Sequence, residues 1–139
     1  MRNTIRATAR VLLGLLFLIM GLNGFFNFLP APTTIPPKAG AFFGAMMATG
    51  YLIPLVSATQ AVAGVFLLSN RFVPLAVVIL APVVVNIAFY HVFLSPTMGV
   101  PLAAVALVLE LYVAWAYREA FRPLLVSRTL NDGRRATND

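Results

Sequence analysis

Residues 72–94 read FVPLAVVILAPVVVNIAFYHVFL, and this stretch predicts the class of the whole chain. It has the length of a bilayer-spanning helix, which needs about 20 residues at a rise of about 1.5 Å each. It carries no charged side chain, yet it contains Pro82, Asn86 and His91. Because lipid cannot satisfy polar side chains, a spanning helix turns them toward other helices. The stretch therefore predicts a helical bundle with a partly polar interior.

The composition of the rest of the chain agrees with a membrane setting. Of its 139 residues, 60% are hydrophobic and only 10% are charged, whereas soluble domains have about 25% charged residues. One domain is expected at this length. The absence of cysteine excludes structural disulfides, dithiol redox chemistry and thiolate-held metal clusters.

Apolar runs predict four spans, at residues 11–29, 51–69, 72–94 and 100–120. Residues 1–10 form a basic amino terminus, and the run that follows is longer than the 7–15 residues or so of a signal peptide, so an uncleaved first span is favoured over a cleaved signal. Four prolines make residues 30–40 a loop. The spans together define a transmembrane domain at residues 11–122.

The long apolar run at residues 41–69 is interrupted by Gly50 and Pro54. We expect a short helix at residues 38–49, near the membrane interface, before the second span; one tilted and kinked helix is the alternative. Asn70 and Arg71 form a tight turn, and residues 95–101 form another. The fourth span ends in WAYREAFRP, an aromatic and arginine border typical of an interface. Residues 123–139 form a polar basic tail, with a short surface helix at residues 121–130 as an option.

The basic residues predict the orientation. Placing both termini in the cytoplasm puts nine of the ten basic residues inside and leaves only Lys38 outside, as the positive-inside rule requires. The nine are Arg2, Arg6, Arg10, Arg71, Arg118, Arg122, Arg128, Arg134 and Arg135. The net charge of +6 then points to anionic lipids at the cytoplasmic face rather than to nucleic acid.

A polar group is expected near the middle of each span: Asn23, Gln60, Asn86 and Glu110. Glu110 lies too deep to reach water, so it should face the bundle and be either protonated or held by donors such as the three amides. One interpretation is that these groups fix helix register through interhelical hydrogen bonds of about 0.6 kcal/mol each. The other is a proton relay or a ligand pocket. The first is favoured because amides outnumber titratable groups.

A second set of polar residues is expected to line a pocket that opens outward: His91, Tyr90 and Asn27. Because the chain has one histidine, it cannot form a bis-histidine haem site or a typical zinc site. A hydrogen-bonded structural role for His91 is favoured over a functional one. No catalytic motif is recognisable, and neither a metal nor a resident cofactor is expected.

The segments GLNGFFNFLP, AGAFFGAMMATGYLIPL, NRFVPLAVVILAPVVVNIAFYHVFLSP and LELYVAWAYREAFRPLL resemble the DoxX family of small bacterial membrane proteins, over about residues 10–125. The resemblance implies a compact four-helix bundle in the bacterial inner membrane. It transfers no catalytic residue. It implies partners in membrane redox or stress-defence complexes, because the family name derives from a subunit of a quinone-linked oxidoreductase.

Three functions are compatible with these features. The first is a non-enzymatic accessory or interaction subunit of a membrane complex, because the chain has no soluble domain. The second is a quinone- or lipid-binding component of a membrane oxidoreductase, in which His91 would donate to a quinone carbonyl. The third is transport of a small solute or proton, which would require a homo-oligomer because four short spans enclose little space.

Overall fold

The computed structural model describes residues 1–96 and 99–125, and all the regular structure in these residues is helical. The predicted all-α class is therefore confirmed for the part of the chain that the structure describes. The predicted tail at residues 126–139, and the end of the optional helix at residues 121–130, lie outside it. The elements in order are α1 (Arg2–Phe26), α2 (Pro37–Ala48), α3 (Leu52–Leu68), α4 (Val73–Phe89), a π-helix (Tyr90–Leu94), α5 (Val100–Ala116), α6 (Arg118–Phe121) and a 3₁₀ turn (Arg122–Leu125).

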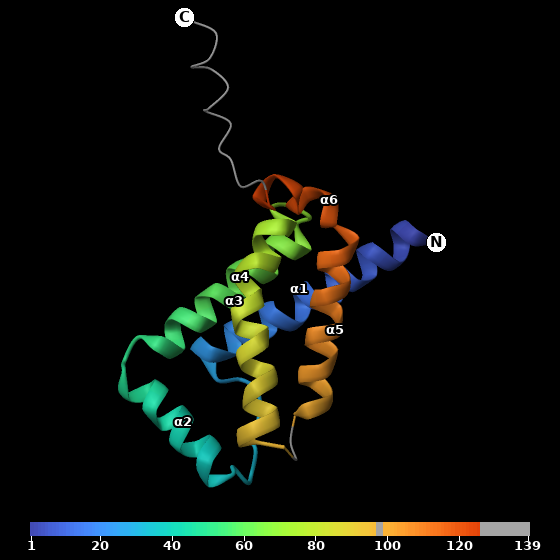
Figure 1. Cartoon of the computed structure of the whole chain (residues 1–139). Helices are drawn as coiled ribbons and strands as arrows, with labels where there is room; N and C mark the ends of the chain where they lie inside the picture. Colours follow the sequence, from blue (N-terminus) through green and yellow to red (C-terminus); the bar gives the residue numbers. More distant parts are fainter. Residues whose placement is uncertain (97–98, 126–139) are drawn as a thin grey trace, which may run out of the picture.

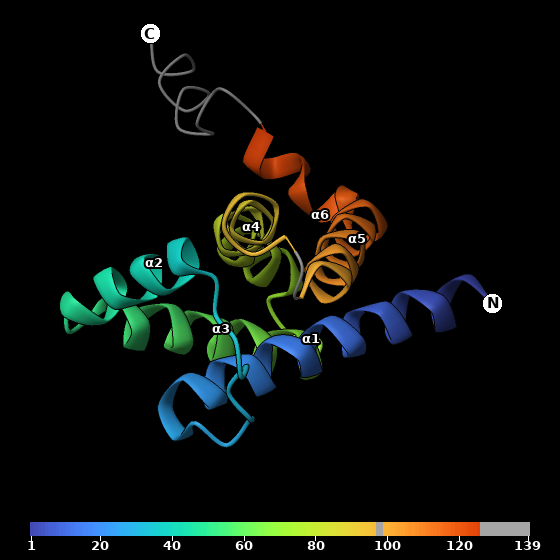
Figure 2. The same ribbon diagram turned by 90° about the horizontal axis from the view of Figure 1, so that it is seen from below.

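The four long helices form two pairs that cross each other. Helices α1 and α3 lie side by side, and α4 and α5 form the second pair (Figure 1). Seen from below, α4 and α5 are viewed nearly end-on while α1 and α3 run across the picture (Figure 2). The bundle is therefore not a set of four nearly parallel rods, which leaves space where the pairs diverge.

The connections divide between two ends of the molecule. The start of α1, the α3–α4 turn and α6 lie toward one end, whereas α2 and the α4–α5 connection lie toward the other (Figure 1). The same grouping appears in a small cavity lined by residues from the start of α1, the α3–α4 turn and the end of α5. Successive long helices thus run between these two ends.

The core is apolar and lies where the two pairs meet. Its largest fully buried side chains are Phe17, Leu13, Leu67, Leu80, Val84 and Val113. The outward faces of the same helices expose large apolar side chains, including Leu15, Val78 and Val108. Water-soluble monomers seldom expose apolar surface on every face, so this surface is suited to lipid.

Glycines let α1 and α3 pack backbone to backbone. A Cβ atom placed on Gly21 would lie 2.5 Å from the Ala61 nitrogen and 2.6 Å from the Ser57 oxygen. One placed on Gly64 would lie 2.6 Å from the Leu18 nitrogen. These distances are far below van der Waals contact, so only glycine fits. Small residues thus allow the α1 and α3 backbones to approach closely, as they do in many pairs of membrane helices.

The break in the long apolar run of residues 41–69 is sharp. Helices α2 and α3 meet at an angle of 93°, and Gly50 adopts a left-handed φ of 73° between them. The Thr49 hydroxyl accepts a hydrogen bond from the Leu52 N–H at 3.1 Å, which caps the new helix. The separate helix is confirmed and the single kinked helix is wrong. Pro54 does not cause the break, because it lies in the first turn of α3, where its missing N–H has no partner to lose.

Other boundaries shift for local reasons. Helix α1 starts at Arg2 rather than near residue 11, because residues 2–10 contain neither proline nor glycine. Helix α2 starts at Pro37, inside the predicted loop, because proline is well suited to a first helical turn. The predicted tight turn at Asn70 and Arg71 is confirmed, with Asn70 left-handed at φ 56°. Helix α4 continues through Pro82.

By length and composition, two described helices can each cross a membrane: Asn3–Phe26 and Val73–Leu94. The bent pair α2 and α3 would make a third span, and α5 is a shorter apolar helix of 17 residues. A helix of 17 residues is at the lower limit for spanning a bilayer. The structure thus supports a membrane protein with two to three spans by this criterion.

Candidate functional site

A cavity of about 720 Å³ lies between the two helix pairs and α2. Most of its wall is apolar, from Leu16, Phe17 and Met20 on α1 to Leu102, Ala103 and Ala106 on α5. Its polar side chains are Asn23, Thr34, Ser57, Gln60, Asn86, Tyr90, His91 and Ser95. An apolar chamber with a few polar groups is the usual form of a small-molecule site.

Five of the seven residues predicted as site residues line this one cavity: Asn23, Gln60, Asn86, Tyr90 and His91. The predicted inner cluster and outer pocket therefore merge. Asn27 and Glu110 are not among the lining residues. Asn27 ends α1 in a left-handed conformation at φ 49° and is exposed.

Glu110 is buried on α5 at 5% exposure, on the face that also carries Ala106 and Val113. Its Oε1 atom has no hydrogen-bond partner among the described residues. The Asn23 Oδ1 accepts a hydrogen bond from the Leu29 N–H at 2.7 Å, which closes the end of α1. The structure thus buries Glu110 as predicted, but the predicted donation to it by the amides is not seen in the described part of the chain.

The amides Gln60 and Asn86 are the clearest polar groups of the cavity that have no other use. Gln60 is buried at 9% exposure on α3, and Asn86 lies on α4. Neither side chain makes a hydrogen bond within the described residues, and both line the cavity. Gln60 is the buried one of the two, and because a buried amide without a partner costs free energy, it favours an occupant that can pair with it. Asn86 is exposed and adds a second amide to the cavity wall.

His91 sits on the π-helix that ends α4. Its Nδ1 lies 2.8 Å from the Ile87 carbonyl oxygen, and a carbonyl can only accept, so Nδ1 carries the hydrogen. In the neutral ring, Nε2 is then an acceptor. This differs from the expected role of His91 as the donor to a quinone carbonyl. π-Helical turns are frequent at functional sites, although the sequence offers no signal for this one.

Aromatic side chains from α2 form the wall opposite α4. The Tyr90 ring centroid lies 5.8 Å from that of Phe42 and 5.4 Å from that of Phe43. Together with Met46, these rings close one side of the cavity. Sequence reasoning missed Phe42, Phe43 and Ser57 as lining residues, because apolar and small residues give no chemical signal of their own.

Among the described residues, no three histidine, aspartate or glutamate side chains come close enough to hold a metal ion.

The family model for DoxX matches residues 5–93 of the chain. The chain belongs to the DoxX family. This DoxX-family chain is a membrane protein, as its apolar helices also indicate. No curated protein matches it. No solved structure matches it.

The DoxX match runs from the start of α1 to the π-helix and ends before α5. It is shorter than the resemblance expected over residues 10–125. It covers the polar residues of the cavity except Ser95, whereas the α5 wall lies outside it. Membership of the DoxX family thus accounts for most of the chamber without assigning it a ligand.

Proposed function

We propose that this DoxX-family protein crosses the membrane four times with both termini in the cytoplasm. Two described helices are long enough to cross alone, and α3 and α5 have 17 residues each. The start of α1, the α3–α4 turn and α6 lie toward one end of the molecule and α2 lies toward the other (Figure 1). The first three elements carry Arg6, Arg10, Arg71 and Arg118, whereas α2 carries Lys38. This asymmetry supports the orientation that the positive-inside rule predicts.

Within that membrane domain, we propose that the cavity binds an amphipathic molecule from the bilayer, of the quinone class or a single lipid. The observation that carries this proposal is the 720 Å³ apolar chamber into which Gln60 and Asn86 bring unused amides. Its volume lies within the range of about 300–1,000 Å³ that small-molecule sites occupy.

The polar groups favour a ligand that bears both carbonyl and hydroxyl forms of oxygen. The amide nitrogens of Gln60 and Asn86 can donate to a carbonyl oxygen, and the amide oxygens of the same two residues can accept from a hydroxyl. The rings of Phe42, Phe43 and Tyr90 offer flat apolar surface. A quinone and its reduced quinol present these features in a planar head group.

The accessory-subunit function is compatible with this binding. No catalytic motif is recognisable in the sequence, and a chain that holds a quinone without a redox centre of its own would serve a partner oxidoreductase. The cavity then has the role of presenting or storing the ligand for that partner. Transport by an oligomer gains no specific support from the described residues.

The test is chemical analysis of the gently purified protein. Solvent extraction and mass spectrometry should find one quinone or one defined lipid per chain, and the Gln60→Leu, Asn86→Leu double variant should retain at least about fivefold less, because each lost hydrogen bond is worth about 1 kcal/mol. Thr59→Val is the matched control, because the Thr59 hydroxyl bonds to Leu55 and does not line the cavity. A phospholipid mixture that matches the bulk membrane, unchanged in the double variant, would refute the proposal.

A further inference from the structure

A second cavity, of about 310 Å³, lies at the end of the molecule where α1 begins. It is lined by Asn3, Arg6, Ala7 and Arg10 from α1, by Asn70 from the α3–α4 turn, and by Ala116 and Tyr117 from the end of α5. Three elements far apart in the sequence thus converge on it. It shares no lining residue with the larger cavity.

Arg10 is the buried anchor of this small cavity, at 9% exposure. Its Nη1 donates to the carbonyl oxygens of Leu67 and Leu68, which end α3 and have no partner within that helix. A cation at a helix carboxyl end is favourable, so Arg10 has a capping role. That role uses only part of the guanidinium, since Nε is buried without a partner among the described residues.

Arg6 gives the cavity wall a second positive charge. Arg6 lies one helical turn before Arg10, on the same face of α1. Asn3, Asn70 and Tyr117 add neutral groups that can donate. Among the described residues that line the cavity there is no carboxylate, so none of them offsets the two guanidinium charges.

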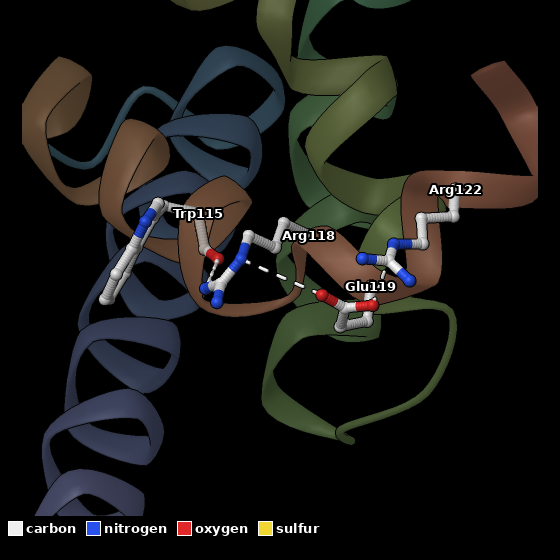
Figure 3. A network of polar contacts seen from close by, with 4 residues as sticks. All are labelled: Trp115, Arg118, Glu119 and Arg122. Atoms are coloured by element: carbon white, nitrogen blue, oxygen red, sulfur yellow. Dashed lines mark hydrogen bonds and ion pairs between the residues drawn. The ribbon is translucent and has the colours of Figure 1, made fainter.

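The acidic residue closest in sequence, Glu119, is committed to other partners. Its Oε2 lies 2.9 Å from Arg122 and its Oε1 lies 3.9 Å from Arg118 (Figure 3). Arg118 also lies over the Trp115 ring at 5.0 Å and donates to the Trp115 carbonyl at 3.2 Å. The described lining of the cavity therefore carries a net positive charge, which favours an anion.

We propose that this cavity, the headgroup site, binds the phosphate group of an anionic membrane phospholipid. Arginine suits phosphate because its planar fork matches two phosphate oxygens. A lipid rather than free phosphate is favoured by the surroundings. Trp115 is 58% exposed and directly precedes the lining residues Ala116 and Tyr117, so the acyl chains of a bound lipid would meet its indole ring beside the phosphate. The inference rests on the membrane setting and not on the quinone proposal.

Trp115 provides the readout, because it is the only tryptophan in the chain and directly precedes two lining residues. The protein is reconstituted in phosphatidylcholine vesicles that contain increasing fractions of phosphatidylglycerol brominated on its acyl chains. Quenching of Trp115 should show preferential binding over brominated phosphatidylcholine. Arg6→Gln should reduce that preference at least about tenfold, because it removes a charge-assisted hydrogen bond to the phosphate in addition to a surface charge.

Arg71→Gln is the matched control, since Arg71 is exposed toward the same end of the molecule but does not line the cavity. It should leave the preference unchanged. Arg10→Gln should also abolish the preference. If the Arg10→Gln protein unfolds because the end of α3 has lost its cap, Arg6→Gln still provides the test. An equal loss in Arg71→Gln would show attraction to general surface charge and overturn the proposal, as would the absence of any preference.

A competition arm separates the two sources of phosphate. In neutral detergent, short-chain phosphatidylglycerol should displace brominated phosphatidylglycerol, whereas inorganic phosphate at the same concentration should not. Equal displacement by inorganic phosphate would identify a free-phosphate site and overturn the lipid assignment.

Discussion

The backbone of Gly99 lies against the imidazole ring of His91, with no room for a side chain between them. A Cβ atom on Gly99 would lie 2.8 Å from His91 Cδ2 and closer still to Nε2. Gly99 precedes the first residue of α5 and has a left-handed φ of 79°. His91 is itself anchored to Ile87 by its Nδ1. The ring therefore sets the distance between the end of α4 and the start of α5, a structural role that stands beside any contact with a ligand.

We expect Gly99→Ala to lower the free energy of unfolding by about 2–4 kcal/mol, because it combines a left-handed backbone with overpacking. Gly50→Ala is the control for the backbone part, since Gly50 has φ 73° and nothing within 4 Å of its Cβ position. Thermal unfolding in detergent measures both. Adding His91→Ala should recover part of the Gly99→Ala loss, as a double-mutant cycle would show. Purely additive losses would mean that the ring does not limit the space.

The α1–α3 contact gives a sharper prediction for two glycines. Gly21→Ala should destabilise the protein by about 1–3 kcal/mol, because its Cβ would meet the Ser57 and Ala61 backbones, which cannot move aside. Gly44→Ala on α2 should instead stabilise by about 0.5–1 kcal/mol, because its Cβ meets nothing within 4 Å and alanine favours helix. The midpoint of thermal unfolding distinguishes them. Equal shifts of the same sign would contradict the close packing of α1 on α3.

The buried Glu110 carboxyl is expected to lower the stability of the protein. Glu110→Leu should raise the free energy of unfolding by about 1–3 kcal/mol, because it removes a buried polar group that has no partner at Oε1 among the described residues. Val108→Leu, on the exposed face of the same helix, should change it little. Denaturation in mixed micelles measures both. Destabilisation by Glu110→Leu would show that the carboxyl has a partner in the membrane-embedded protein.

The proposed topology can be tested directly because the chain has no cysteine. Thr33→Cys, in the α1–α2 loop, should react with a membrane-impermeant maleimide in intact cells. Ser69→Cys, in the α3–α4 turn, should react only after lysis. Both residues are exposed at their sites, so burial does not confound the comparison. The reverse pattern would invert the orientation, and labelling of both in intact cells would remove α3 as a spanning element.

Local features of the fold were predictable because they depend on residues close in sequence. Gly50 predicts the break between α2 and α3, and Asn70 with Arg71 predicts the turn before α4, since each needs only a short-range backbone preference. The predicted first span began at residue 11, whereas α1 begins at Arg2. The arginines near the amino terminus indicate the edge of the membrane, but they do not indicate where the helix begins.

The candidate site was likewise predictable only in part. Polar residues in apolar runs indicated Asn23, Gln60, Asn86, Tyr90 and His91, and the structure places all five around one chamber. The sequence could not show that Asn27 ends a helix or that Glu110 is buried without a partner for Oε1 among the described residues. A helix face predicts that a residue points inward, but which helix lies opposite depends on how the helices cross.

Hydrophobicity and charge thus sufficed to establish an all-helical membrane protein, because both are sums over residues that do not depend on packing. The crossing of the α1–α3 pair over α4 and α5, and the two cavities that result, depended on tertiary contacts. The physical reason is that crossing geometry follows from how side chains of different helices interlock. Gly21 and Gly64 allow one close contact between helices, while the rings of Phe42 and Tyr90 lie side by side in the wall of the larger cavity.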